Sequence, residues 1–171
     1  MKSLIVFAIT FAMLLISPNG RAQVNSCACC TENHKAFDFW LGTWQVTNTD
    51  GSLAGTNTIV KTESDCVIRE NWTSANEGYT GTSTNFYNLE TNQWEQLWID
   101  SSGAHLKLKG KRVGNQMILI SDDIKKDDGA LSRNRITWTK NDDGTVRQLW
   151  EILNGEKVIS VAFDGLYKKN Q

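Results

Sequence analysis

The chain has 171 residues, of which 40% are hydrophobic and 22% are charged, and its formal net charge is −1 at pH 7. This length and composition are typical of one folded domain. Charges of both signs are spread along the chain, so the sequence offers no basic face for nucleic acid or for an anionic membrane surface. We therefore expect neither to be a partner.

Residues 1–22 have the pattern of an export signal. A lone lysine precedes an apolar run from Leu4 to Ile16, and the small residues Gly20 and Ala22 stand at the −3 and −1 positions of a cleavage site. The run is too short to span a bilayer, which takes about 20 apolar residues. The sequence therefore predicts a signal peptide and a secreted or periplasmic mature chain, with a membrane anchor as the alternative. Removing the signal leaves 16 basic against 19 acidic side chains, a net charge of −3.

The next segment, residues 23–30, is rich in cysteine. Cys27, Cys29 and Cys30 lie close together and Cys66 follows in the domain, and an exported chain is expected to form disulfides. Adjacent Cys29 and Cys30 can bridge each other only with strain, so one of the first three should pair with Cys66. We predict Cys30–Cys66, because Cys30 is nearest the helix expected to dock on the domain. Cys27 and Cys29 then pair locally, link two molecules or stay free.

Two other interpretations of this segment remain open. Thiolates and imidazole suit zinc or cuprous copper, so Cys27, Cys29, Cys30 and His34 form a possible metal site, although their spacing matches no strong zinc motif. A lipid attached to Cys27 is the second interpretation, since a lipid-attachment site puts a cysteine at the start of a mature chain. The main prediction includes no cofactor.

One helix is predicted, from Thr31 to Leu41. Phe37, Trp40 and Leu41 fall at positions i, i+3 and i+4 and form one apolar stripe. The stripe leads directly into Gly42 and a strand-like stretch. We expect a short helix that caps one end of the domain.

From residue 42 onward the pattern predicts an antiparallel β meander. Clusters of Gly, Asn and Asp, which tolerate the positive φ of tight hairpins, separate runs of roughly 8 to 11 residues rich in Thr, Val, Ile, Trp and Tyr. Ten strands in a row leave two exposed edges unless the sheet closes. The fold class predicted for residues 31–171 is therefore all-β, a closed up-and-down antiparallel β-barrel with a short N-terminal capping helix. The expected strands are 42–49, 53–62, 65–74, 79–88, 93–100, 104–111, 115–122, 132–140, 145–153 and 157–168.

A short motif in this pattern carries a resemblance to a known family. Gly42-Thr43-Trp44, which opens the first strand after a helical turn, resembles the Gly-x-Trp signature of the calycin superfamily, which includes lipocalins and fatty-acid-binding proteins. A longer pattern is similar to a group of uncharacterised secreted bacterial proteins, and that resemblance implies a fold without an activity. The pattern comprises Phe37-Asp38-Phe39-Trp40, Cys66 to Trp72, Trp94 to Asp100 and Phe163 to Tyr167.

The chain also departs from these families. Fatty-acid-binding proteins insert a helical lid between their first two strands, and here only residues 48–52 fill that gap. Lipocalins usually pair the Gly-x-Trp indole with a basic residue of the last strand, for which Lys168 is the candidate. Some related ten-stranded barrels bind haem through a histidine, and neither His34 nor His105 is a good match for that role.

The tryptophans suggest a ligand site. If they face inward, indoles from separate strands line an aromatic cavity, since ligand pockets are mostly apolar with a few polar groups that orient the ligand. Ten-stranded barrels enclose more space than side chains readily fill, although indoles that simply fill the barrel are the alternative. We predict binding of a small apolar or aromatic molecule, with Trp44 as a packing anchor near the closed end. The predicted site comprises Trp44, Glu70, Trp72, Gln96, Trp98, Trp138, Gln148 and Trp150.

Two rival functions remain. An isomerase, cyclase or hydrolase could use Glu70 as acid or base, because burial in an aromatic lumen raises the pKa of a carboxyl group; an outward Glu70 paired with a Lys or Arg is the alternative. Asp100 and His105 flank one hairpin turn and could also meet as a proton-transferring pair. The second rival function is that of an interaction module with a filled barrel, whose outward Leu97 and Ile99 contact a partner. The sequence leaves ligand identity and oligomeric state open.

Overall fold

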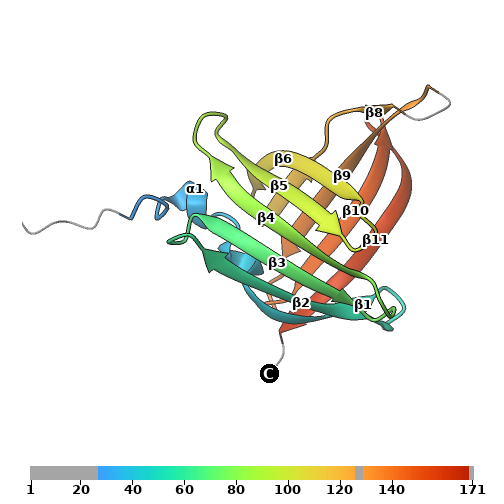
Figure 1. The fold of residues 1–171 in the computed structure, drawn as a ribbon, viewed down its shortest axis with the longest axis horizontal. Helices are drawn as coiled ribbons and strands as arrows, with labels where there is room; N and C mark the ends of the chain where they lie inside the picture. Colours follow the sequence, from blue (N-terminus) through green and yellow to red (C-terminus); the bar gives the residue numbers. More distant parts are fainter. Residues whose placement is uncertain (1–26, 126–128, 170–171) are drawn as a thin grey trace, which may run out of the picture.

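The computed structural model describes residues 27–125 and 129–169, which form a β-barrel (Figure 1). The all-β class and the antiparallel barrel predicted from the sequence are confirmed, while the predicted signal peptide lies outside the described residues. The strands of the barrel are β1 (Gly42–Asn48), β2 (Leu53–Thr62), β3 (Val67–Ser74), β4 (Thr80–Asn88), β5 (Gln93–Asp100), β6 (His105–Val113), β7 (Gln116–Ile120), β9 (Leu131–Lys140), β10 (Val146–Asn154) and β11 (Lys157–Lys169).

The sheet closes because its last strands meet its first. β11 pairs with β1 on one side and with β10 on the other, and β10 pairs with β9, which also pairs with β7. Every barrel strand thus has two neighbours, and no long edge is left exposed. A two-residue strand that the sequence analysis did not predict, β8 (Ile124–Lys125), pairs with β9 outside the ring.

Two short helices precede β1 where one continuous helix was predicted. They are α1 (Glu32–Lys35) and the 3-10 helix η1 (Asp38–Trp40). The segment that contains both helices and the residues between them, 32–40, is called the plug below. The predicted short N-terminal helix is confirmed, but it is not continuous from Thr31 to Leu41, because Phe37, with φ −107° and ψ 6°, interrupts it. The break lets the Phe37 and Trp40 rings stack with centroids 4.9 Å apart, and both are fully buried. Over the described ranges, no helix has the length and apolar character that crossing a bilayer requires.

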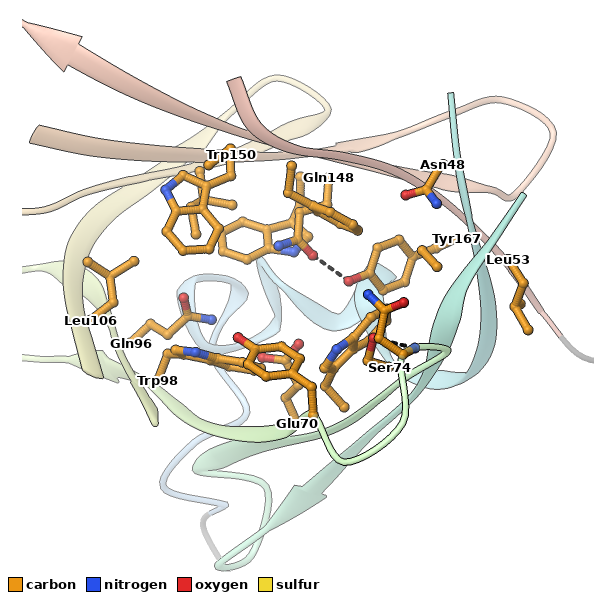
Figure 2. Close-up of a pocket in the computed structure, with 18 residues that line it drawn as sticks. Asn48, Leu53, Glu70, Ser74, Gln96, Trp98, Leu106, Gln148, Trp150 and Tyr167 are labelled. Carbon is orange, nitrogen blue, oxygen red and sulfur yellow. Dashed lines mark hydrogen bonds between the residues drawn. The ribbon is translucent and has the colours of Figure 1, made fainter. Parts of the chain in front are cut away.

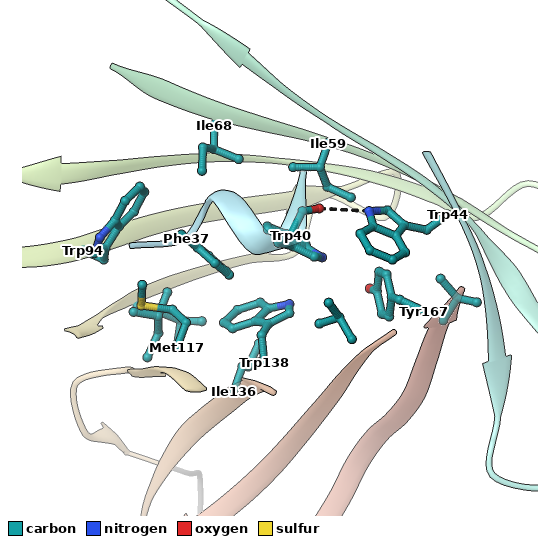
Figure 3. Close-up of a cluster of buried hydrophobic side chains, with 14 of the residues drawn as sticks. Phe37, Trp40, Trp44, Ile59, Ile68, Trp94, Met117, Ile136, Trp138 and Tyr167 are labelled. Atoms are coloured by element: carbon teal, nitrogen blue, oxygen red, sulfur yellow. Dashed lines mark hydrogen bonds between the residues drawn. The ribbon is translucent and has the colours of Figure 1, made fainter. Parts of the chain in front are cut away.

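The plug fills one end of the barrel with aromatic side chains, as Figure 3 shows. The Phe37 ring lies edge-on to Trp94 and to Trp138, at centroid distances of 5.6 and 5.1 Å. Trp44 Nε1 of the Gly-x-Trp motif donates a hydrogen bond of 2.9 Å to the Trp40 carbonyl. This bond and the buried rings join β1 to the plug, and the end of the barrel that they fill is the closed end.

Polar contacts fix the plug to the surrounding strands. Trp94 Nε1 donates to the Asn33 carbonyl at 3.0 Å, and Lys61 Nζ lies 2.8 Å from Asp38 Oδ1.

The turns after β1, β3, β5, β7 and β10 lie at the opposite end, which is the open end. The plug therefore leaves the two ends of the barrel unlike each other.

The basic partner of the Gly-x-Trp indole is Lys169. Its Nζ lies 5.2 Å from the Trp44 ring centroid, whereas Lys168 pairs in register with Gln45. The expectation of Lys168 was wrong by one residue, because neighbouring residues of a strand point to opposite faces. Lys169 is exposed although the Trp44 ring is buried, and a cation at such an exposed site contributes about 0.5 to 1 kcal/mol.

The cysteines form two disulfides, Cys27–Cys30 and Cys29–Cys66. The predicted Cys30–Cys66 bond was therefore wrong. A turn in which the Cys30 N–H donates to the Cys27 carbonyl brings those two residues together, with Cα atoms 5.4 Å apart. Cys29 is then the buried member, and it reaches Cys66 in the β2–β3 turn at the closed end.

The two disulfides also bear on the metal-site and lipid interpretations of the cysteine-rich segment. No thiolate remains for the proposed metal site of Cys27, Cys29, Cys30 and His34, and no other cluster of metal ligands occurs in the parts of the chain that the structure describes. The His34 Nδ1 atom lies 2.7 Å from the hydroxyl group of Thr31, the N-cap residue of α1. A sulfur bonded to Cys30 is likewise unavailable for the lipid considered at Cys27.

We predict that the two disulfides contribute unequally to stability. The Cys29–Cys66 bond spans 37 residues and the Cys27–Cys30 bond spans 3. In the chain-entropy model, replacing the first pair by Ala lowers the free energy of unfolding by about 4 kcal/mol, and replacing the second by about 1.5 kcal/mol. Urea unfolding of the two double variants measures both losses. Equal losses would contradict a dominant role of Cys29–Cys66 in holding the plug.

Candidate functional site

The half of the barrel that the plug does not fill contains a cavity of about 340 Å³. Figure 2 shows Glu70, Gln96 and Trp98 on one wall, facing Gln148, Trp150 and Tyr167 across the space. The floor consists of residues shared with the aromatic core, among them Trp138. The cavity thus lies between the plug and the open end.

The structure brings most of the predicted site residues together around this cavity. Trp44 lies apart from them, fully buried in the core at the closed end. Tyr79, Phe163 and Tyr167 also line the cavity, and the sequence analysis missed them. The predicted residues that line it are Glu70, Trp72, Gln96, Trp98, Trp138, Gln148 and Trp150.

Two of the indoles lie against the barrel wall, next to glycines of neighbouring strands. A Cβ atom added at Gly81 would come within 2.1 Å of the Trp98 ring, and one added at Gly55 within 2.7 Å of the Trp72 ring. A larger residue at either position would push the ring away from the wall. Glycine therefore helps keep the lumen open although it is lined with large side chains.

Indole nitrogens at the cavity differ in their partners. Trp150 Nε1 donates to Asn134 Oδ1 at 2.8 Å. The buried Trp138 Nε1 has no hydrogen-bond partner within the described part of the chain, and neither does the buried Asn57 Oδ1. Buried polar groups are normally paired. Trp138 lines the cavity, so its Nε1 is a candidate to donate to a ligand or an ordered water molecule, whereas Asn57 lies behind the lining.

Glu70 is the buried acid of the site. It lies on β3 with 4% of its surface exposed, and it faces the cavity. Asn57 Nδ2 donates to Oε1 at 2.7 Å and Ser83 Oγ donates to Oε2 at 2.6 Å. Burial removes water from the charged form and raises the pKa of Glu70 to about 7, although these two hydrogen bonds lower it in part.

A network of neutral polar groups surrounds this carboxyl group. The Tyr167 hydroxyl accepts a hydrogen bond of 3.3 Å from Asn57 Nδ2 and donates to Gln148 Oε1. Burial raises the pKa of Tyr167 well above its ordinary value, and the nearby charge of Glu70 raises it further. On the other side of Glu70, Gln96 Nε2 lies 3.4 Å from Ser83 Oγ. The network crosses the lumen and holds Glu70 in one orientation.

The alternative in which Glu70 points outward to a Lys or Arg is wrong. Among the ion pairs of the described residues none includes Glu70, and the residues lining the cavity include no Lys, Arg or His. Ser83 pairs in register with Glu70, and directly opposed residues of neighbouring strands lie on the same face, which here is the inward one. The two-residue period of β4 was the available signal for Ser83, but Thr and Ser on both faces of β4 conceal it.

The proposed pair of Asp100 and His105 does not form. Asp100 Oδ1 accepts hydrogen bonds from the backbone of Ser102 and Ala104, and Oδ2 accepts one of 3.2 Å from the Tyr79 hydroxyl. Asp100 therefore shapes its own turn at the open end, beside the cavity. The hydrogen bonds recorded for the described residues include none between Asp100 and His105.

Comparison with protein-family models gave no match to this chain. Comparison with curated proteins gave no match either. The site is therefore interpreted from its own geometry.

We predict that Glu70 makes stability depend on pH. Its pKa of about 7 in the folded state exceeds the ordinary 4.5, so its contribution to stability is full below about pH 4.5 and is lost as pH rises through about 7. Relative to Glu70→Gln, the wild type should lose about 2.5 kcal/mol of unfolding free energy between about pH 5 and pH 8. Urea unfolding of both proteins over this range isolates the effect, and parallel curves would contradict it.

We also predict that Gly81→Ala displaces the Trp98 indole. The added methyl group overlaps the ring, so overpacking should cost about 1 to 3 kcal/mol and change the near-ultraviolet circular dichroism of the tryptophans. Thr80→Ala, at an exposed neighbouring position of β4, is the control and should change neither quantity. An unchanged spectrum of Gly81→Ala would show that the ring does not lie against Gly81.

Proposed function

We propose that this protein is an exported barrel of the calycin type that binds a small apolar or aromatic molecule in its lumen. The observation that carries the proposal is the cavity of about 340 Å³, which has tryptophans from four strands in its lining. Aromatic walls with a few fixed polar groups are typical of small-molecule sites. Glu70, Gln96 and Gln148 would orient the ligand.

Export is supported by the two disulfides, because such bonds persist in oxidising compartments. The signal pattern of residues 1–22 agrees with it. Membership of the calycin superfamily is supported by the barrel and by the Gly-x-Trp motif, whose indole contacts the plug and a basic residue of the last strand.

A cavity of this size is an argument against a filled barrel that serves only as an interaction module. Leu97 and Ile99 do point outward, with 37% and 45% of their surfaces exposed. Single exposed apolar residues are normal on soluble proteins, however, and they identify no partner.

An enzyme is the second candidate, and one observation favours it. A carboxyl group with a pKa of about 7 is suited to proton transfer near neutral pH, and Glu70 is held at the cavity wall. An isomerase, cyclase or hydrolase of this kind would lose turnover in Glu70→Gln while keeping its fold. A carrier would turn over no substrate in either form.

We predict saturable binding of aromatic and apolar probes by the disulfide-bonded chain. Quenching of tryptophan fluorescence measures it, since four of the tryptophans line the cavity. Trp98→Leu should weaken binding about tenfold, because it removes an aromatic wall at a cost of roughly 1.4 kcal/mol. Leu97→Ser, at the outward neighbour of Trp98, should leave the affinity unchanged. A folded protein that saturates with no probe of a broad apolar set would contradict the proposed function.

A further inference from the structure

The cavity contains a buried acid without a positively charged partner. Glu70 accepts hydrogen bonds from two neutral groups, Asn57 and Ser83, and no Lys, Arg or His lines the cavity around it. The buried Asn57 Oδ1, on the side chain that donates to Glu70, is an unpaired acceptor. A buried carboxyl group of this kind favours a ligand that supplies positive charge and hydrogen-bond donors.

We propose that the ligand is a small organic cation, an amine with an aromatic or alkyl body, whose ammonium group lies beside Glu70. This inference rests on the proposed function and names its ligand class. The ammonium group neutralises the carboxylate, and the hydrocarbon body contacts the indoles of the lumen. An anionic ligand would instead place a second negative charge beside a carboxyl group that has no cation near it.

The aromatic lining supports the same charge. Trp72, Trp98, Trp138 and Trp150 all line the cavity, and the face of an indole attracts a cation more strongly than any other aromatic side chain. This attraction increases where water is excluded, as it is around Glu70. An acid combined with several indoles therefore distinguishes an ammonium group from a neutral group of the same size.

Part of the open end carries negative charge as well. Three of its turns, residues 49–52, 75–79 and 100–104, contain Asp50, Glu77 and Asp100 and no Lys or Arg. Within the described residues none of these acids forms an ion pair. Clefts lined by one sign of charge raise the local concentration of the opposite ion, so these three turns favour the approach of a cation. In the other two turns of this end, Asp122, Asp123 and Glu156 are paired with Lys109 and Arg133.

The surroundings of Glu70 allow a clean pH test. Around it β2, β4, β5 and β10 present neutral amides and a hydroxyl, while β11 presents the Tyr167 phenol. Tyr79 also lines the cavity. Burial raises the pKa of both tyrosines, so neither should ionise around neutral pH. Glu70 is thus the cavity group that changes charge there.

The experiment compares three probes with similar phenyl-bearing chains by isothermal titration calorimetry on the disulfide-bonded chain. Phenethylamine is the cation, phenethyl alcohol the neutral analogue and hydrocinnamate the anion. At about pH 8, where Glu70 is ionised, we expect the amine to bind about tenfold or more tightly than the alcohol, and the anion to bind least. The advantage of the amine should shrink as pH falls through about 7, because Glu70 gains a proton while an amine with a pKa of about 10 stays charged.

Glu70→Gln should abolish the preference for the amine and keep the binding of the alcohol. Glu90→Gln removes the same charge from an exposed turn at the closed end, and it should keep the preference. If Glu70→Gln fails to fold, the pH series on the wild type decides the matter alone.

The outcomes separate this inference from the proposed function. Equal affinity for amine and alcohol at about pH 8 would overturn the cation and leave an apolar carrier. An amine advantage that does not change with pH would overturn the placement of the ammonium group beside Glu70. Failure of all three probes, together with failure of the broader apolar set, would overturn both.

Discussion

The closed ring of ten strands encloses more volume than its inward side chains fill, and the other features depend on how that volume is divided. Phe37 and Trp40 enter from the N-terminal side and fill one half together with strand residues such as Trp138. The other half stays open. Glycines next to Trp72 and Trp98 let those rings lie against the wall. The same residue type, tryptophan, therefore serves as core at one end and as cavity lining at the other.

A buried carboxyl group in this space has a cost that its neighbours only partly offset. Glu70 lies in contact with donors from β2 and β4, yet its pKa remains raised because neutral donors compensate incompletely for lost water. A structural role alone would be served as well by an apolar side chain, which has no such cost. The network of Asn57, Ser83 and Tyr167 is thus a site that gives up stability to keep an acid in place.

Much of the fold could be predicted, because turn residues mark where each strand ends. The expected bounds of β2, for example, coincide with the observed Leu53–Thr62. Details that depend on tertiary contacts could not. The helix breaks at Phe37 so that two rings enter the barrel, and the choice of Cys29 for Cys66 follows from a local turn between Cys27 and Cys30. The tryptophans and Glu70 stood out in the sequence, whereas Asn57 and Ser83 lie in strands rich in Thr and Asn on both faces, where alternation carries little information.

The covalent bond between Cys29 and the β2–β3 turn determines the route by which a molecule can reach the lumen of the barrel. The disulfide holds the plug against the barrel wall at the closed end, so the lumen is a cavity open at one end rather than a channel. A molecule that enters the cavity through the open end must leave by the same end, so binding and release share one route. The rate at which such a molecule exchanges then depends on the turns at the open end, while the disulfide-linked closed end keeps the floor of the cavity fixed.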